Sequence, residues 1–308
     1  DTDSAKIYHS TTAPSQHGFT KSLKVDIGNT ETPSSGQMAG IQQRIEGQDL
    51  QGLAYGTSSG KTLTLSFWVR SVKTGTYSIQ VIQHYSSGSY KYVLYEYTIS
   101  STNTWEQKTI TISPNTSDAI QDDTSIGFYV TWWLCAHSDV TTSATSSWTS
   151  GGSYRASTNQ VNLWDSGSND WYLTGCQLEV GDTATAFEHR SFGEELILCQ
   201  RYYQQYVNPC CTGVIPDNGS KAYSIGLQFQ TRMRAVPTLT IANAGTGGNV
   251  SDGGSTQFIS SLSAADRNVD GASMYLNLAG DLGDFRPACL GLNDSTTNTT
   301  TYKFTADL

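Results

Sequence analysis

The chain has 308 residues, of which 15% are charged, and its formal net charge at pH 7 is −9. This length is enough for about two domains. The acidic balance excludes a broad phosphate-binding surface, so we expect no nucleic acid partner. No apolar run reaches about 18 residues, so we also expect no membrane insertion.

Alternation of apolar and polar residues with a period of two marks the first part of the chain. It is found over residues 62–69, 77–82, 108–112, 127–134 and 171–180. This pattern is typical of strands with one buried face, and Gly-containing turns separate the segments. We therefore predict a mainly β fold in which residues 1–190 form an antiparallel β-sandwich, specifically a jelly roll.

A short helix is predicted directly after this sandwich. Ser191 and Glu194 have the spacing of a capping box, and residues 195–206 contain no Gly or Pro. We assign residues 191–208 to this connecting helix, or neck. Its apolar side chains can pack under one domain or against copies of themselves in a homotrimer, and the sequence leaves both open. The residues of such an oligomer interface are Leu196, Cys199, Tyr202, Tyr203 and Tyr206.

A second β region follows the predicted neck. Strand patterns recur over residues 222–230, 237–242, 257–262, 273–278 and 302–305. Gly-rich loops join them, notably residues 244–254. We assign residues 209–308 to a second, smaller β-sandwich that forms a C-terminal head.

Aromatic residues near Ser- and Gly-rich sequence are candidates for ligand stacking. Aromatic faces can stack on the C–H surfaces of sugars, and loops on a rigid sandwich can present them. The alternative is that they close one end of the sandwich or line a subunit interface. The candidates are Tyr85, Tyr90, Trp148, Tyr154 and Trp164.

Two adjacent tryptophans lie on one predicted strand. Because successive strand residues point to opposite faces, Trp132 and Trp133 must face opposite sides of the sheet. We expect one of them to lie in the core, and the other is a candidate sugar-binding platform.

Polar residues in the predicted loops of the head are a second set of candidate ligand contacts. They are chosen on loop position alone, as groups that can hydrogen-bond to sugar hydroxyls. This set comprises Asp217, Asn218, Asn243, Asn249, Asp252 and Arg267.

One stretch resembles the first half of a calcium-binding loop. Asp266, Asn268 and Asp270, followed by Gly271, fit the pattern D-x-N-x-D-G. The twelfth position is Asn277 rather than Glu, and Asn, Asp and Gly also form ordinary turns. Calcium is therefore a speculative cofactor here, and no other cofactor is expected.

The sequence offers no recognisable catalytic motif. Glu179, Asp182 and Glu188 would form a glycosidase pair only if the fold placed two of them across a cleft. No G-x-S-x-G elbow or phosphate-binding loop is present. We therefore expect a protein that is not an enzyme.

Several short motifs occur in order along the chain: residues 105–112 (WEQKTITI), 156–162 (ASTNQVN), 172–181 (YLTGCQLEVG), 185–190 (TAFEHR) and 194–203, which includes EEL and CQRYY. With these motifs, the chain between Trp105 and Tyr203 resembles a family of bacteriophage tail-fibre and related virion proteins, especially those of marine and cyanobacterial phages. Residues 64–71 fit the opening strands of the same family domain. The chain departs from the family pattern at Cys176, where Val is more usual, and at Trp164, where Leu or Phe is usual.

The resemblance implies a jelly roll of carbohydrate-binding-module type, carried on a fibre that is a homotrimer. It carries over no catalytic residues. It implies partners among other tail or capsid proteins, and a place in the virion after assembly in the cytoplasm of the host bacterium.

Three hypotheses follow for the function. The first is a receptor-binding tail fibre that adheres to a host surface glycan or lipopolysaccharide through several weak sites acting together. The second is a structural or decoration fibre that binds no ligand. The third is an accessory module of a polysaccharide-degrading enzyme.

Overall fold

The computed structural model describes residues 4–86, 88–152, 154–207, 211–215, 221–224, 226–242, 248–251, 256–278, 280, 286–292 and 301–307. The chain divides into two compact units, Asp1–Glu188 and His189–Asp307. Of the helices in the described part of the chain, none combines the length and apolar character needed to cross a bilayer.

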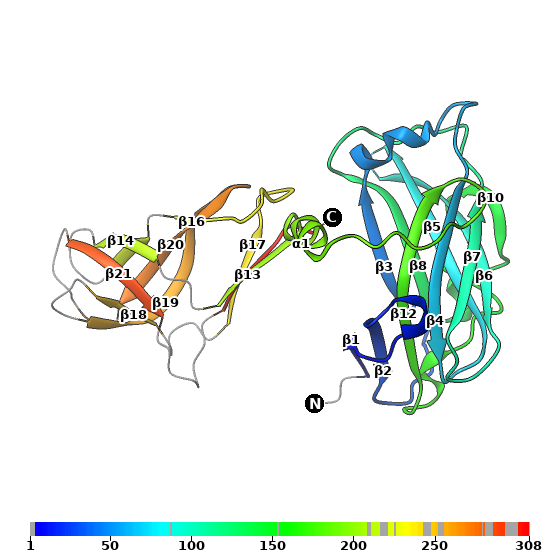
Figure 1. The fold of residues 1–308 in the computed structure, drawn as a ribbon, viewed down its shortest axis with the longest axis horizontal. Coiled ribbons are helices and arrows are strands. Elements are labelled where there is room, and N and C mark those ends of the chain that lie inside the picture. Colours follow the sequence, from blue (N-terminus) through cyan, green and yellow to red (C-terminus); the bar gives the residue numbers. More distant parts are fainter. Residues whose placement is uncertain are drawn as a thin grey trace. The chain divides into compact units, whose positions relative to one another are not determined.

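The first unit is built from two antiparallel sheets that pack face to face (Figure 1). Sheet A has the order β1 (Ala5–Ser10), β2 (Ser22–Ile27), β12 (Asp170–Val180), β4 (Leu63–Ser71) and β7 (Glu106–Ile112). Sheet B has the order β10 (Thr145–Ser150), β6 (Ser89–Ile99), β5 (Gly75–Ser86), β8 (Ile126–Ala136) and β3 (Met38–Glu46). This arrangement confirms the predicted mainly β sandwich.

Short elements complete the first unit. A two-residue parallel pair joins β9 (Thr141–Thr142) to β11 (Ala156–Ser157). Four 3-10 turns connect the strands: η1 (Ser15–His17), η2 (Gly47–Leu53), η3 (Ser138–Val140) and η4 (Leu163–Asp165).

The core between the sheets is made by the apolar half of each alternating strand. On β8, Phe128, Val130 and Trp132 are buried and belong to one cluster with Phe67 and Val69 of β4. Burying a side chain of this size contributes about 1.5–3 kcal/mol to the free energy of folding. The apolar face of each strand therefore determines which side of the strand turns toward the core. All five strand segments predicted in this unit lie within or overlap observed strands.

The predicted helix is shorter than expected. Helix α1 spans Phe192–Gln200, and Ser191 and Glu194 form the complete capping box that the sequence indicated. The prediction of a helix as far as residue 208 was wrong, because Tyr203–Val207 forms strand β13, which pairs with β22 (Thr301–Thr305). The partner strand lies almost a hundred residues further along the chain, where no local pattern points to it, although Tyr and Val are residues that favour strands.

The second unit contains two antiparallel sheets. In the smaller one, β22 lies between β13 and β17 (Thr238–Ala242). The larger one has the order β15 (Lys221–Ser224), β14 (Cys211–Ile215), β21 (Arg286–Leu292), β18 (Gly248–Ser251), β19 (Thr256–Arg267), β20 (Gly271–Leu278) and β16 (Leu227–Gln228). Because β15 also pairs with β20, this sheet closes on itself.

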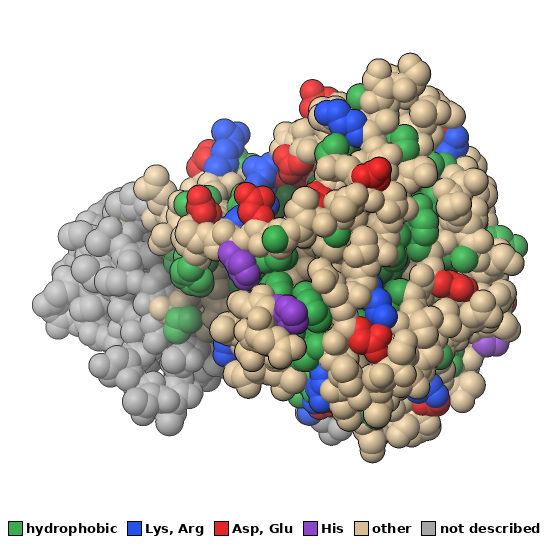
Figure 2. Space-filling view, turned by 45° about the vertical axis from the view of Figure 1, so that its right-hand side comes forward, with side chains coloured by type: hydrophobic (Ala, Val, Ile, Leu, Met, Phe, Trp, Pro, Cys, Tyr) green, Lys and Arg blue, Asp and Glu red, His purple; other side chains and the backbone are tan. Residues whose placement is uncertain are grey.

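The surface of the described residues is mostly uncharged. Figure 2 shows polar uncharged side chains and backbone over most of the visible face, with acidic and basic groups in small, scattered patches. This matches a sequence in which only 15% of residues are charged.

Candidate functional site

The outer face of sheet B, which points away from the core, carries aromatic and polar side chains together with a few aliphatic ones. The strand register places Arg44, Tyr129, Ile82 and Tyr92 in one row across β3, β8, β5 and β6. The next row contains Gln42, Thr131, Gln80 and Leu94, and the row after it begins with Gly40 and Trp133. Neighbours in a row lie about 4.5–5.5 Å apart at Cβ, so their side chains form one surface.

A hollow of about 270 Å³ opens on this surface. We call it the sheet B hollow. Its nine lining residues come from β3, β5, β6, β8 and the segment after β10: Gln42, Arg44, Gln80, Ile82, His84, Tyr90, Tyr129, Trp133 and Arg155.

Aromatic rings form much of the hollow. The His84 and Tyr129 rings meet edge to face with centroids 5.0 Å apart, and the His84 and Tyr90 centroids lie 5.8 Å apart. Ile82, Tyr92 and Leu94 form a separate apolar cluster on this face, against which Tyr90 and Tyr129 pack. Such a ring surface suits the apolar C–H face of a sugar ring.

Polar groups stand around these rings. Thr131 Oγ1 accepts a hydrogen bond from Gln42 Nε2 at 3.0 Å, and Gln42 Oε1 accepts one from Arg44 Nε at 2.9 Å. The Arg44 guanidinium lies 5.4 Å from the centroid of the Tyr129 ring. Burial lowers the pKa of His84, so its imidazole is neutral near pH 7 and offers one donor and one acceptor.

Two buried polar atoms belonging to lining residues lack a partner. Among the described residues, neither Gln80 Oε1 nor the Trp133 indole Nε1 makes a hydrogen bond. An unpaired buried donor or acceptor costs about 1–3 kcal/mol.

A strap of residues 154–160 crosses part of the outer face. Gln80 Nε2 donates to Tyr154 O at 2.9 Å, and the Ser157 amide donates to Ser78 Oγ at 2.8 Å. Asn159 Nδ2 donates to Glu96 Oε1 at 3.1 Å. The strap therefore covers one side of the face and leaves the hollow beside it.

The structure separates the five aromatic candidates. Tyr90 lines the sheet B hollow, and Trp133, the outward member of the tryptophan pair, lines it too, whereas Trp132 lies in the core as expected. Tyr154 is exposed on the strap, and Tyr85 is half-buried near the end of β5.

The other two tryptophans have structural contacts. Trp148 Nε1 donates to Ser113 O at 2.7 Å, and its ring packs against Tyr55 and Phe128. Trp164 is buried in the core cluster. These are the contacts that the alternative interpretation, closure of the sandwich, predicts.

Sequence reasoning missed most of the hollow. It did not single out Gln42, Arg44, His84, Tyr129 or Arg155, although the first four lie on the non-core positions of alternating strands. The usable signal was the outward half of the alternating strands, but of these four residues only Tyr129 lies in a segment predicted as a strand, since β3 was not predicted and the β5 segment ended at residue 82.

Two of the six loop candidates of the head, Asn249 and Arg267, belong to the described residues. Asp217, Asn218, Asn243 and Asp252 lie outside the described residues. Asn249 lies within strand β18 and not in a loop as predicted, because Gly248–Ser251 pairs with both β19 and β21. Arg267 is exposed at the end of β19.

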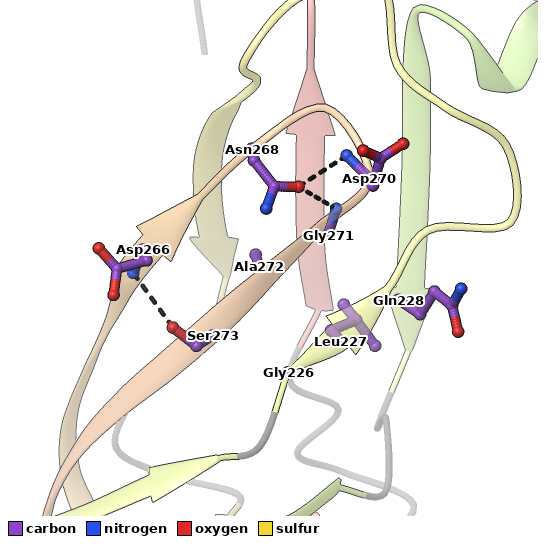
Figure 3. Close-up of a pocket in the computed structure, with 9 residues that line it drawn as sticks. All are labelled: Gly226, Leu227, Gln228, Asp266, Asn268, Asp270, Gly271, Ala272 and Ser273. Atoms are coloured by element: carbon purple, nitrogen blue, oxygen red, sulfur yellow. Dashed lines mark hydrogen bonds between the residues drawn. The ribbon is translucent and has the colours of Figure 1, made fainter.

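The calcium-like stretch forms the hairpin turn between β19 and β20. Asn268 Oδ1 accepts hydrogen bonds from the amides of Asp270 and Gly271 at 2.8 and 2.9 Å. Figure 3 shows the Asp266 carboxylate pointing away from Asn268 and Asp270. The turn interpretation is thus confirmed, and the described residues contain no group of three His, Cys, Asp or Glu placed to hold a metal.

The predicted oligomer interface is divided between two elements. Leu196 and Cys199 are exposed on α1, whereas Tyr203 and Tyr206 lie on β13 and Tyr202 lies between the two elements. Tyr206 is half-buried and donates to Gln204 Oε1 at 2.7 Å. None of the α1 residues is buried, and Phe192 is 83% exposed.

One of the carboxylates considered for catalysis, Glu179, has a pKa shifted in the direction opposite to that of a general acid. Hydrogen bonds from Thr185 and Gln177 lower the pKa of Glu179, whereas a glycosidase acid needs a raised one. Asp182 accepts a hydrogen bond from Thr183, next to it in the chain, and Glu188 is exposed.

No protein-family model matches the chain, and no curated protein matches it. Similar solved structures include a protein from Bacteroides thetaiotaomicron VPI-5482 described as sugar-binding, with 12% identity over 59% of this chain and 85% of that one and a TM-score of 0.34. The enzymatically active domain of bacteriophage CBA120 tailspike protein 4 has 12% identity over 58% of this chain and 18% of that one, with a TM-score of 0.33.

A third similar structure is the C-terminal family 22 carbohydrate-binding module of a Clostridium thermocellum protein. It has 13% identity over 60% of this chain and 85% of that one, with a TM-score of 0.30.

Proposed function

We propose that the first unit binds a host cell-surface glycan in the sheet B hollow, and that the protein is a receptor-binding part of a bacteriophage tail fibre. The observation that carries the binding proposal is the hollow lined by His84, Tyr90, Tyr129 and Trp133 beside the amide of Gln42. Rings that stack on a sugar, together with fixed amide and guanidinium donors, are the means by which proteins grip polyols.

The fibre part of the proposal rests on the sequence resemblance and on α1. Phe192, Ile197 and Leu198 are exposed on one nine-residue helix. An apolar helix of this kind is stabilised when it is covered, and copies of itself in a homotrimer provide that cover. Three joined hollows would convert weak single-site binding into firm adhesion.

The proposal gives the protein a binding role without catalysis and a place in the virion, after assembly in the bacterial cytoplasm. Its other partners would be tail or capsid proteins.

An array of bacterial surface polysaccharides tests this function. The full chain should bind at least one polysaccharide and release no new reducing ends from it. Absence of binding by a folded oligomer would favour the structural or decoration fibre. Release of reducing ends would show an enzyme and contradict the proposed role.

A further inference from the structure

The sheet B hollow has a charge opposite to that of the chain. Its lining residues, all of them described, include two guanidinium groups, those of Arg44 and Arg155, and no Asp or Glu. The whole chain has 27 acidic and 18 basic residues. A lining whose charged groups are both cations, in an acidic protein, attracts an anionic ligand while the remaining surface repels it.

One acidic residue of the outer face is engaged by the strap. Glu96 lies on the outer face in the row of Trp133 and Ser78. Its Oε1 accepts a hydrogen bond from Asn159 Nδ2 at 3.1 Å, which ties it to the strap. Arg44 and Arg155 are the charged residues among those that line the hollow.

Arg44 is held in place by a chain of side chains. Thr131 orients Gln42, and Gln42 accepts from Arg44 Nε at 2.9 Å. The guanidinium also lies 5.4 Å from the centre of the Tyr129 ring. A guanidinium that is already oriented loses little freedom on binding, and its planar fork matches a carboxylate or phosphate.

Arg155 supplies a second cation from a different element. It belongs to the strap, where its Nη1 donates to Tyr154 O at 3.2 Å. The same carbonyl accepts from Gln80 Nε2 at 2.9 Å, which anchors this part of the strap to β5. Two guanidinium groups, one from edge strand β3 and one from the strap, thus line one hollow with an aromatic ring surface.

We propose that the ligand of the hollow is an acidic saccharide, with a sugar ring on the aromatic surface and a carboxylate or phosphate substituent bound by Arg44 and Arg155. This inference rests on the proposed glycan-binding function and specifies its ligand class. The shared chemistry is an oxyanion fixed to a sugar ring. Uronic acids and phosphorylated sugars are its two sources.

Matched polysaccharide pairs test the ligand class. The full chain is assayed on bacterial polysaccharides containing uronic acid and on the same polymers after reduction of their carboxyl groups, and on phosphorylated polymers before and after dephosphorylation. We expect loss of the anionic group to weaken binding about tenfold or more, since charge-assisted hydrogen bonds are lost. The pair that shows this loss identifies the oxyanion.

Two variants separate a specific contact from general charge. Arg155→Gln and Lys61→Gln each remove one positive charge, but Lys61 is exposed and does not line the hollow. We expect about tenfold weaker binding of the acidic polymer for Arg155→Gln and no change for Lys61→Gln. Equal losses in both variants would overturn the proposal.

The outcomes also separate this inference from the proposed function. Equal binding to the native and the neutralised polymers would overturn the acidic-ligand inference and leave glycan binding intact. Absence of binding to every polymer by the folded protein would overturn both.

Discussion

Gly40 lies directly across from Trp133 in the β3–β8 pair, and a Cβ at Gly40 would lie 2.9 Å from the indole Cε3 and 2.6 Å from the carbonyl oxygen of Trp132. Both distances are shorter than real Cβ contacts. The missing side chain therefore makes room for the indole at the sheet B hollow, and Trp133 keeps its position only with glycine opposite.

Replacing this glycine is expected to affect both stability and binding. Gly40→Ala should destabilise the first unit by about 1–3 kcal/mol, because a backbone carbonyl and a packed indole must both move. It should also weaken glycan binding. Urea unfolding and polysaccharide affinity measure the two effects.

A matched glycine provides the control. A Cβ at Gly52, in η2, would have no neighbour within 4 Å. Gly52→Ala should therefore change neither stability nor affinity appreciably. Equal stability and affinity of the Gly40→Ala and Gly52→Ala proteins would show that the backbone at Gly40 does not lie this close to Trp133.

Self-association should depend on the exposed apolar side chains of α1. Ile197 is 56% exposed, and Ile197→Asp would place a charge within any interface that buries it. Light scattering after size exclusion should give three times the 33.4 kDa chain mass for the parent and the single mass for the variant. Glu195→Gln on the same helix should remain trimeric. A monomeric parent protein at micromolar concentration would contradict the trimer.

The hydrogen bonds that tie Ser35 and Gly36, just before β3, to Asp139 are expected to persist in acid. Hydrogen bonds from Ser35 and His137 and from the Gly36 amide lower the pKa of Asp139 to about 2. The folded pKa lies below the unfolded value of about 3.9. The ionised carboxylate therefore stabilises the folded contact fully above pH 3.9, and this stabilisation is lost as the pH falls through about 2.

The titration of Asp139 can be followed directly. Its side-chain carboxyl resonance should titrate near pH 2, and the Gly36 amide should stay protected from exchange at pH 3.5. Asp139→Asn should remove that protection. A carboxyl midpoint near 3.9 would show that the three hydrogen bonds do not persist in solution.

Much of the fold followed from local patterns. Alternation located β4, β5, β7, β8 and β12 and put Trp132 and Trp133 on opposite faces. The capping box at Ser191 correctly located the start of α1. These features depend on neighbours in sequence, which is why they could be predicted.

The end of α1 and the candidate site depend on distant partners. Strand β13 forms because β22, far along the chain, pairs with it. The hollow joins Gln42 of β3 to Arg155 of the strap, and only the sheet order and register bring them together. Of the five aromatic candidates named from sequence, Tyr90 lines the hollow, because its position on β6 places it on the outer face of sheet B beside His84.

The most direct test compares two tyrosine variants of the full chain. Tyr129 lines the sheet B hollow, whereas Tyr8 is 44% exposed on β1 of sheet A. For the polysaccharide that the array identifies, Tyr129→Ala should bind at least about tenfold more weakly, since a stacking ring is lost, and Tyr8→Ala should bind like the parent. Undiminished binding by a folded Tyr129→Ala protein would contradict the assignment of the glycan site to sheet B.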